Sequence, residues 1–142
     1  MTALEDIKIR VETPQAAPYQ AQNALPVLHQ IRHALNRLVE TGESTVIDLS
    51  AIPFGPGDRE QLLDKLGEGE VQATVSSLGD THIQETAYPG VWQVQYLAPT
   101  GEELAHHIEI TLLPTLLSSP LEDVADAARA LSNELNTEHD PA

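Results

Sequence analysis

Between Glu70 and Leu113 the apolar residues alternate with polar ones, and a period of two is the signature of β-strands. Three turn signals rich in glycine and proline interrupt the alternation: Leu78-Gly79-Asp80, Tyr88-Pro89-Gly90 and Pro99-Thr100-Gly101. Short alternating stretches joined by tight turns are typical of antiparallel neighbours. The segment therefore predicts a meander with one buried face, whose four strands cover residues 71–75, 81–86, 91–97 and 102–113.

The segments on either side of this meander show the helical period instead, and a short strand is predicted at Thr45–Leu49. The first helix is predicted from about Leu25 to Glu40, with a buried stripe of Leu25, Leu28, Ile31, Leu35, Leu38 and Val39. Asp58 is the predicted N-cap of a short second helix, with Gln61 completing a capping box. The last helix has a predicted buried stripe of Leu121, Val124, Ala125, Ala128, Leu131 and Leu135.

These elements predict an α+β fold class: an antiparallel four- to five-stranded meander sheet with two long helices and one short helix packed on one face. The two long helices are expected to lie side by side. A single domain is predicted over residues 23–136, because 142 residues are enough for one domain. Residues 1–22 are predicted to form an extended leader, in which only Ile7, Ile9 and Val11 alternate like a strand. Residues 137–142 are predicted to be a frayed tail.

The net charge of −15, from 22 acidic and 7 basic residues, constrains the partners. A field of that sign repels nucleic-acid phosphates and anionic lipids, so neither nucleic-acid binding nor membrane insertion is expected. The same field attracts proteins that carry basic patches.

The chain has no cysteine, which excludes disulfides, thiol catalysis and thiolate-bound metal held by this chain alone. No apolar run approaches the length of a membrane span, and the first residues carry Glu5 and Asp6 where a signal peptide would be apolar. The expected location is the cytoplasm.

Six histidines raise the question of a metal site. His29 and His33 have the four-residue helical spacing at which two imidazoles can share an ion, but the acidic residue of the zincin pattern is missing. His106 and His107 are adjacent on a strand and therefore point to opposite faces. We expect the chain to bind no metal and no cofactor.

Catalytic patterns are equally sparse. The glycines of Gly55-Pro56-Gly57 and Gly67-Glu68-Gly69 do not lead from a strand into a helix as a phosphate-binding loop requires. The sequence therefore indicates a protein that is not an enzyme. Two alternatives stay open: a small hydrolase-like enzyme using His82 or His106 with a glutamate, and an acidic decoy that binds basic proteins.

Two motifs are more specific than these patterns. The first is Leu-Gly-Glu-Gly-Glu-Val at residues 66–71, and the second is Glu-Thr-Ala-Tyr-Pro-Gly-Val-Trp at residues 85–92. Together with Ile108-Glu109-Ile110, in this order, they resemble the C-terminal domain of the HupH/HyaF family of hydrogenase expression proteins. The resemblance extends from about Leu62 to Pro114.

The resemblance implies a non-enzymatic accessory protein in the maturation of an uptake [NiFe] hydrogenase. It implies that the partner is a hydrogenase subunit, above all the small subunit, or another maturation factor. Within the shared motifs we predict structural roles for Gly67, Glu68, Gly69, Glu70 and Trp92.

The hairpin around Pro89 is the predicted partner-binding surface. Trp92 shares a strand face with Val94 and Tyr96, so it is expected to be buried and structural. Tyr88 lies at the turn, where an exposed aromatic beside a rigid Pro-Gly pair can contact a partner. The predicted partner-binding residues are Gln84, Glu85, Tyr88, Pro89 and Gly90.

Overall fold

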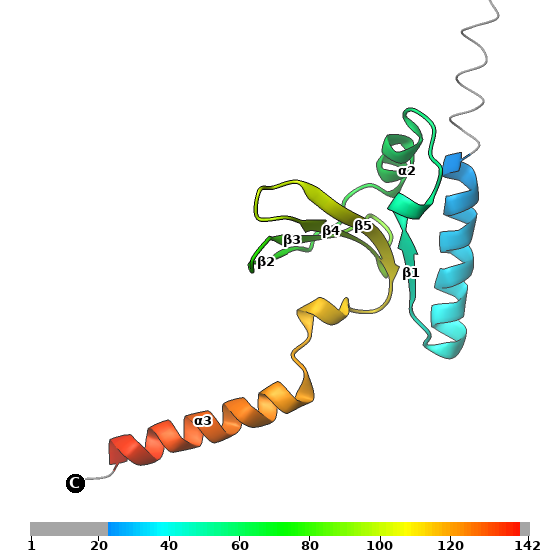
Figure 1. Ribbon diagram of the computed structural model, residues 1–142. Helices are drawn as coiled ribbons and strands as arrows, with labels where there is room; N and C mark the ends of the chain where they lie inside the picture. Colours follow the sequence, from blue (N-terminus) through cyan, green and yellow to red (C-terminus); the bar gives the residue numbers. More distant parts are fainter. Residues whose placement is uncertain (1–22, 140–142) are drawn as a thin grey trace, which may run out of the picture. The chain divides into compact units, whose positions relative to one another are not determined.

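The computed structural model describes residues 23–139 of the chain (Figure 1). The chain divides into two compact units, called here the sheet unit (Met1–Leu112) and the helical unit (Leu113–Ala142). The predicted leader, with its possible strand at residues 7–11, lies outside the described residues. Each unit is considered by itself.

The sheet unit contains a five-stranded antiparallel sheet in the order β1-β5-β4-β3-β2. Four strands follow one another as the predicted meander, and the fifth pairs with the last of them at the far edge, Thr45 opposite Ile110. The predicted α+β class and its meander are confirmed. The strands are β1 (Thr45–Asp48), β2 (Gln72–Val75), β3 (Thr81–Glu85), β4 (Val91–Leu97) and β5 (Glu103–Ile110).

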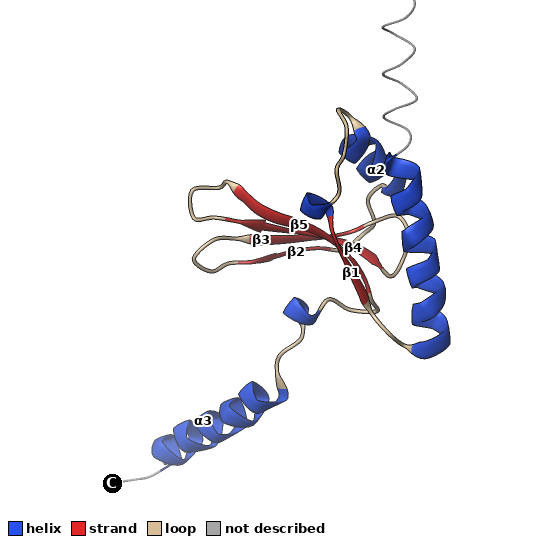
Figure 2. Ribbon diagram, turned by 45° about the vertical axis from the view of Figure 1, so that its right-hand side comes forward, coloured by secondary structure: helices blue, strands red, loops and turns tan. Residues whose placement is uncertain are grey.

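Two helices pack on one face of this sheet: the first helix, residues 23–41, and α2 (Asp58–Leu66). The first helix lies alongside β1 in both ribbon views (Figures 1 and 2). Each aliphatic side chain that is fully buried in such a core contributes about 1.5–3 kcal/mol. The shared core comprises Ala24, Val27, Ile31, Ala34 and Leu38 of the first helix, Leu62 and Leu66 of α2, and Ile47, Leu49, Val91, Ile108 and Ile110.

The opposite face of the sheet also carries buried apolar side chains. The register sets Val91 opposite Ile110 and Trp92 opposite Glu109, so neighbouring residues of β4 point to opposite faces. Val91, Trp92 and Val94 are all buried. The expectation of one buried face is therefore wrong along β4, because apolar residues occupy both parities of this strand.

The start of α2 differs from the predicted capping box. Its N-cap is Gly57, which has a positive φ of 84° and makes no side-chain cap bond. The carboxylate of Asp58 instead accepts the Gly55 N–H at 2.8 Å and the Asn23 amide at 3.0 Å. Because Asp58 is fully buried, its carboxylate ties the start of the first helix to the loop before α2.

The helical unit consists of a short 3₁₀ turn, η2 (Thr115–Leu117), and the long helix α3 (Leu121–His139). α3 reaches three residues into the predicted tail. The predicted buried stripe is wrong for this unit, since Leu121 is 84% exposed and Leu131 is 61% exposed. Within the described part of the helical unit only η2 accompanies α3, so no second helix or strand of that unit covers the apolar face. No helix within residues 23–139 combines the length and hydropathy of a membrane span.

Candidate functional site

The predicted partner-binding residues lie around the turn that joins β3 to β4. The Val91 N–H donates to the Tyr88 carbonyl at 3.0 Å, with Pro89 and Gly90 between them. Proline followed by a glycine at positive φ, here 94°, is the pattern of a type II turn. The buried hydroxyl of Thr86 donates to the Val91 carbonyl at 2.9 Å and accepts the Tyr88 N–H at 3.1 Å. The turn is therefore rigid.

An open groove of about 330 Å³ lies between this turn and the C-terminal half of the first helix. We call it the turn groove. Gly90 faces the helix at ordinary van der Waals distance, since an added Cβ would stand 3.5 Å from the Leu35 methyl group. The positive φ of Gly90 is what favours glycine here. The groove is lined mainly by apolar groups, from Leu35, Leu38 and Val39 of the helix and from Glu85, Pro89, Gly90, Trp92 and Leu112.

Large apolar side chains at the turn groove and its turn are exposed to solvent. Val39 is 84% exposed, Leu112 is 82% exposed and Tyr88, in the adjoining turn, is 53% exposed. Apolar groups gathered around a rigid turn are a common feature of protein interaction sites. The geometry of the site thus favours binding of another molecule's apolar side chains.

The Gly-Glu-Gly-Glu segment holds the end of β3 in place. The Gly69 N–H donates to the Glu85 carbonyl at 2.7 Å, and the Glu70 N–H donates to Glu85 Oε1 at 3.2 Å. A Cβ at Gly69 would stand 2.4 Å from the Thr86 carbonyl oxygen, so only glycine fits this position. Gly67, with a φ of 67°, ends α2. The exposed Glu68 makes no comparable contact among the described residues.

Two predicted partner-binding residues do not line the turn groove. Tyr88 lies in the adjoining turn, and Gln84 lies on the other face of the sheet. The register pairs it with Gln72 and Gln93, on the sheet face opposite to that of Glu85. Its amide donates to the Glu85 carbonyl at 2.7 Å. The structure therefore brings Glu85, Pro89 and Gly90 together and separates Gln84 from them.

Trp92 is 5% exposed and contributes to the wall of the groove. Its indole N–H donates to the Thr111 carbonyl at 3.1 Å, which satisfies the polar edge of a buried ring. Glu85 lies opposite Trp92 on β3, and Glu109 lies opposite it on β5. Burial raises the pKa of Glu109, and the nearby His107 offsets part of this effect.

His106, a catalytic alternative, is buried in a polar network on the helix-covered face. Arg59 of α2 donates to His106 Nδ1 and to both carboxylate oxygens of Glu103, the latter at 3.0 and 2.9 Å. The other ring nitrogen, Nε2, lies 3.1 Å from the Gln93 amide oxygen. Burial and then the Arg59 guanidinium lower the pKa of His106. Because both ring nitrogens are engaged, neither is available to act as a base on a substrate.

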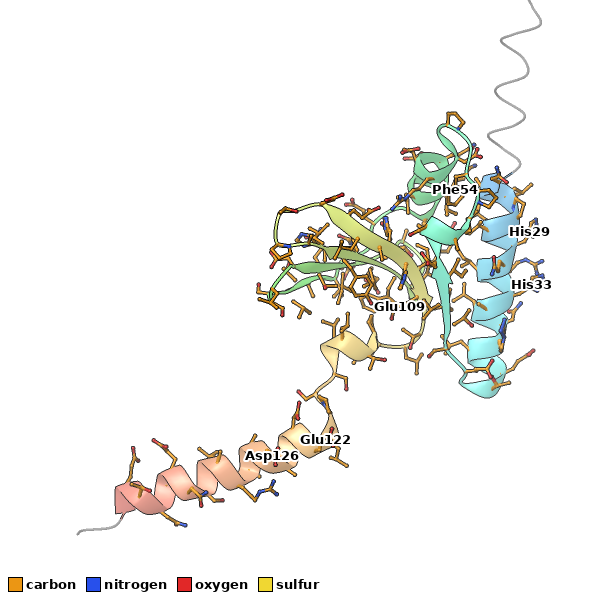
Figure 3. The ribbon with its side chains drawn as sticks, in the orientation of Figure 1. His29, His33, Phe54, Glu109, Glu122 and Asp126 are labelled. Carbon is orange, nitrogen blue, oxygen red and sulfur yellow. The ribbon has the colours of Figure 1, made fainter. Side chains whose placement is uncertain are left out.

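The remaining histidines do not converge. His29 and His33 are exposed and point away from the sheet (Figure 3). His82 is exposed as well, and its Nδ1 lies 3.3 Å from the Thr74 hydroxyl. His107 lies on the sheet face opposite to His106. Among residues 23–139 there is no group of three or more potential metal ligands.

Sequence reasoning missed two exposed residues of the turn groove, Val39 and Leu112, and the placement of Glu109 beside Trp92. Val39 was assigned to the buried stripe together with Leu38, yet adjacent helical positions are about 100° apart and cannot both face the core. That spacing could have identified Val39 as exposed. Leu112 lies beyond the end of β5, so the alternation of the strand does not predict its place at the groove.

Comparison with known proteins gives curated relatives along most of the chain. The hydrogenase expression/formation protein HupQ of Azotobacter chroococcum mcd 1 is 35% identical over 116 residues, which cover 80% of this chain and 41% of HupQ. HoxQ of Azotobacter vinelandii is 36% identical over 111 residues, 77% of this chain and 39% of HoxQ. The chain thus spans about two-fifths of the length of these relatives.

A solved structure agrees with the fold. The hydrogenase expression protein HupH from Thiobacillus denitrificans ATCC 25259 is 43% identical, with a TM-score of 0.76 over 81% of this chain and 96% of that one. Residues 21–137 match the family model described as HupH hydrogenase expression protein, C-terminal conserved region. The family resemblance seen in the sequence motifs is confirmed: the chain belongs to the HupH C-terminal family.

Proposed function

We propose that this chain is a non-enzymatic assembly factor in the maturation of a [NiFe] hydrogenase. It binds a hydrogenase subunit, with the small subunit as first candidate, or another maturation protein, and it does so in the cytoplasm. The relatives are named hydrogenase expression/formation proteins, which supports a role in hydrogenase maturation. The turn groove supports the proposal that the chain acts by binding another protein.

The observation that carries the proposal is the exposed apolar lining of the turn groove. Val39 and Leu112 expose most of their surface, while the turn beneath them is fixed by the hydrogen bonds of Thr86. A rigid apolar surface loses little conformational entropy when a partner binds. The candidate base His106, by contrast, has both nitrogens engaged, so the geometry favours binding over catalysis.

The proposal is tested by capture from cells that produce the hydrogenase. The tagged chain and its variants Val39→Ser and Tyr88→Ala are purified, and the co-purifying hydrogenase subunits are identified and quantified by mass spectrometry. We expect both variants to melt within a few degrees of the parent, because both side chains are exposed. Capture of the subunit should fall about tenfold or more, as expected for interface anchors.

Two variants serve as controls. Leu78→Ser changes an apolar side chain that is equally exposed, at 87%, but lies at the β2–β3 turn outside the groove, and it should leave capture unchanged. Trp92→Ala removes a buried ring and should cost about 3–5 kcal/mol of stability. The binding surface lies elsewhere if Val39→Ser captures the subunit as well as Leu78→Ser does. Undiminished hydrogenase activity after deletion of the gene contradicts the assembly role itself.

A further inference from the structure

Two carboxylates flank Trp92 on one face of the sheet. Glu85, Trp92 and Glu109 are cross-strand neighbours on β3, β4 and β5. Neighbouring strands are about 4.8 Å apart, so the three side chains form one row across the sheet. Glu85 lines the turn groove, and Glu109 extends the row along β5 (Figure 3).

Neither carboxylate forms an ion pair with a cation of the described residues. The ion pairs within residues 23–139 are made by Arg37, Arg59, His106, His107 and Arg129, and none of them involves Glu85 or Glu109. Glu85 accepts a hydrogen bond from the Glu70 N–H, which fixes its position and leaves its charge uncompensated. Burial raises the pKa of Glu109, and the nearby His107 offsets only part of this effect.

We propose, on the basis of the function proposed above, that the turn groove binds a partner segment in which an apolar side chain is accompanied by a nearby arginine or lysine. The apolar side chain contacts Val39, Leu35 and Leu112. The cation pairs with Glu85 at the groove and extends toward Glu109. Charge-assisted hydrogen bonds to partly desolvated carboxylates are stronger than neutral ones.

The negative charge of the chain disfavours an acidic segment or a second copy as the molecule bound in the turn groove. An acidic amphipathic segment would place its carboxylates against Glu85 and against a chain of net charge −15. A second copy carries the same net charge, so the long-range field opposes self-association. A basic segment is attracted over the whole approach, which raises its association rate.

Three synthetic fluorescein-labelled peptides of equal length test the proposal by fluorescence anisotropy against the intact chain at 0.15 M salt. The first alternates leucine and arginine, the second replaces arginine by glutamate, and the third replaces leucine by serine. We expect the first peptide to bind at least about tenfold more tightly than either of the others. The Val39→Ser variant should weaken its binding by a similar factor.

Matched charge variants separate local pairing from the general field. Glu85→Gln and Glu109→Gln should each weaken the leucine–arginine peptide several-fold, whereas Glu102→Gln should change its affinity by less than twofold. All three remove one negative charge, but Glu102 is an exposed residue outside the row. Glutamine retains a side-chain oxygen that can accept the Glu70 N–H, so the fold is preserved in Glu85→Gln.

The inference is overturned if the glutamate peptide binds as tightly, if Glu102→Gln weakens binding as much as Glu85→Gln, or if none of the peptides binds. Its failure is distinct from failure of the assembly role. Loss of subunit capture in Val39→Ser, with full capture in Glu85→Gln and Glu109→Gln, leaves the proposed function intact and removes only the basic partner segment.

Discussion

The described part of the first helix and α3 both carry an apolar stripe, but their stripes have different environments. In the first helix Ile31 is 4% exposed and Ala34 is fully buried, because Ile47, Ile108 and Ile110 of the sheet complete the same core. In α3, Leu131 is 61% exposed. The same sequence period thus accompanies a helix that is part of a core and one that is not.

The difference lies in the connections. Residues 42–44 alone join the first helix to β1, and Gly42, with a φ of 76°, donates its N–H to the Leu38 carbonyl at 2.9 Å. Such a tight C-terminal cap turns the chain straight back along the helix and makes it a neighbour of β1. An apolar stripe therefore predicts that a helix can pack, and the connection decides where.

The largest expected effect comes from truncating matched side chains of the two stripes. Ile31→Ala should lower the free energy of unfolding by about 2–5 kcal/mol, because it opens a cavity in the core. Leu131→Ala should change it by no more than about 0.5 kcal/mol, as an exposed residue does. Urea unfolding followed by the fluorescence of Trp92, the single tryptophan, measures both. A loss above 1 kcal/mol in Leu131→Ala would mean that the α3 stripe is covered in solution.

A matched pair of arginines sharpens the same comparison. Arg59→Gln should cost about 1–3 kcal/mol, since it removes a donor that Glu103 and the buried His106 share. Arg129→Gln removes an exposed pair with Asp126 one turn away and should cost at most about 0.5 kcal/mol. Both variants lose one positive charge, so the general field changes equally. Equal losses of stability would show that net charge, and not the network, explains the effect.

The smallest effect is a dependence of stability on pH that is confined to the sheet unit. The pKa of His106 in the folded chain lies below the ordinary value of 6.5, so the unfolded chain takes up a proton first as the pH falls. Its contribution is complete above pH 6.5 and declines below it. Gln93, Arg59, Glu103 and His107 are the polar and charged groups around the ring.

This prediction is checked by melting temperatures between pH 7.5 and 5.5. The parent chain should lose stability over that range, and His106→Gln should lose less. The comparison of the two removes the contributions of groups common to both, including Glu109, whose raised pKa acts in the opposite direction. Parallel curves for the two chains contradict the assignment to His106.

Much of the fold could be predicted because short-range rules determine it. The turn residues Gly79, Gly90 and Gly101 lie between strands that pair with their sequence neighbours, so alternation and turn chemistry sufficed for the meander. The capping of α2 could not be predicted this way, because Asp58 bonds to Asn23, a residue distant in the sequence. The exposure of the α3 stripe could not be predicted either, because helical periodicity does not show which element, if any, covers an apolar face.

The sequence allowed the turn of the candidate site to be predicted, but not the residues that line the groove beside it. Pro89 and Gly90 predict a tight turn, and Glu85 lies just before it at the end of β3. The groove itself needs Leu35 and Val39 from a helix far back in the chain. The neighbours of Trp92, Glu85 and Glu109, depend on the strand register, and a shift of one residue would place them on the other face.

The pairing of β1 with β5 has a consequence for how the chain folds. Every other strand pair joins consecutive segments through a short turn, whereas the contact of Thr45 with Ile110 closes a loop that includes most of the sheet unit. Closing a loop of this length costs conformational entropy before the contacts of β1 with β5 can stabilise it. The hairpins of β2 to β5 are therefore favoured to form first. The first helix and β1 then dock together on the finished meander. The turn groove, which is lined by the first helix and by the β3–β4 turn, is then completed in the last step of folding.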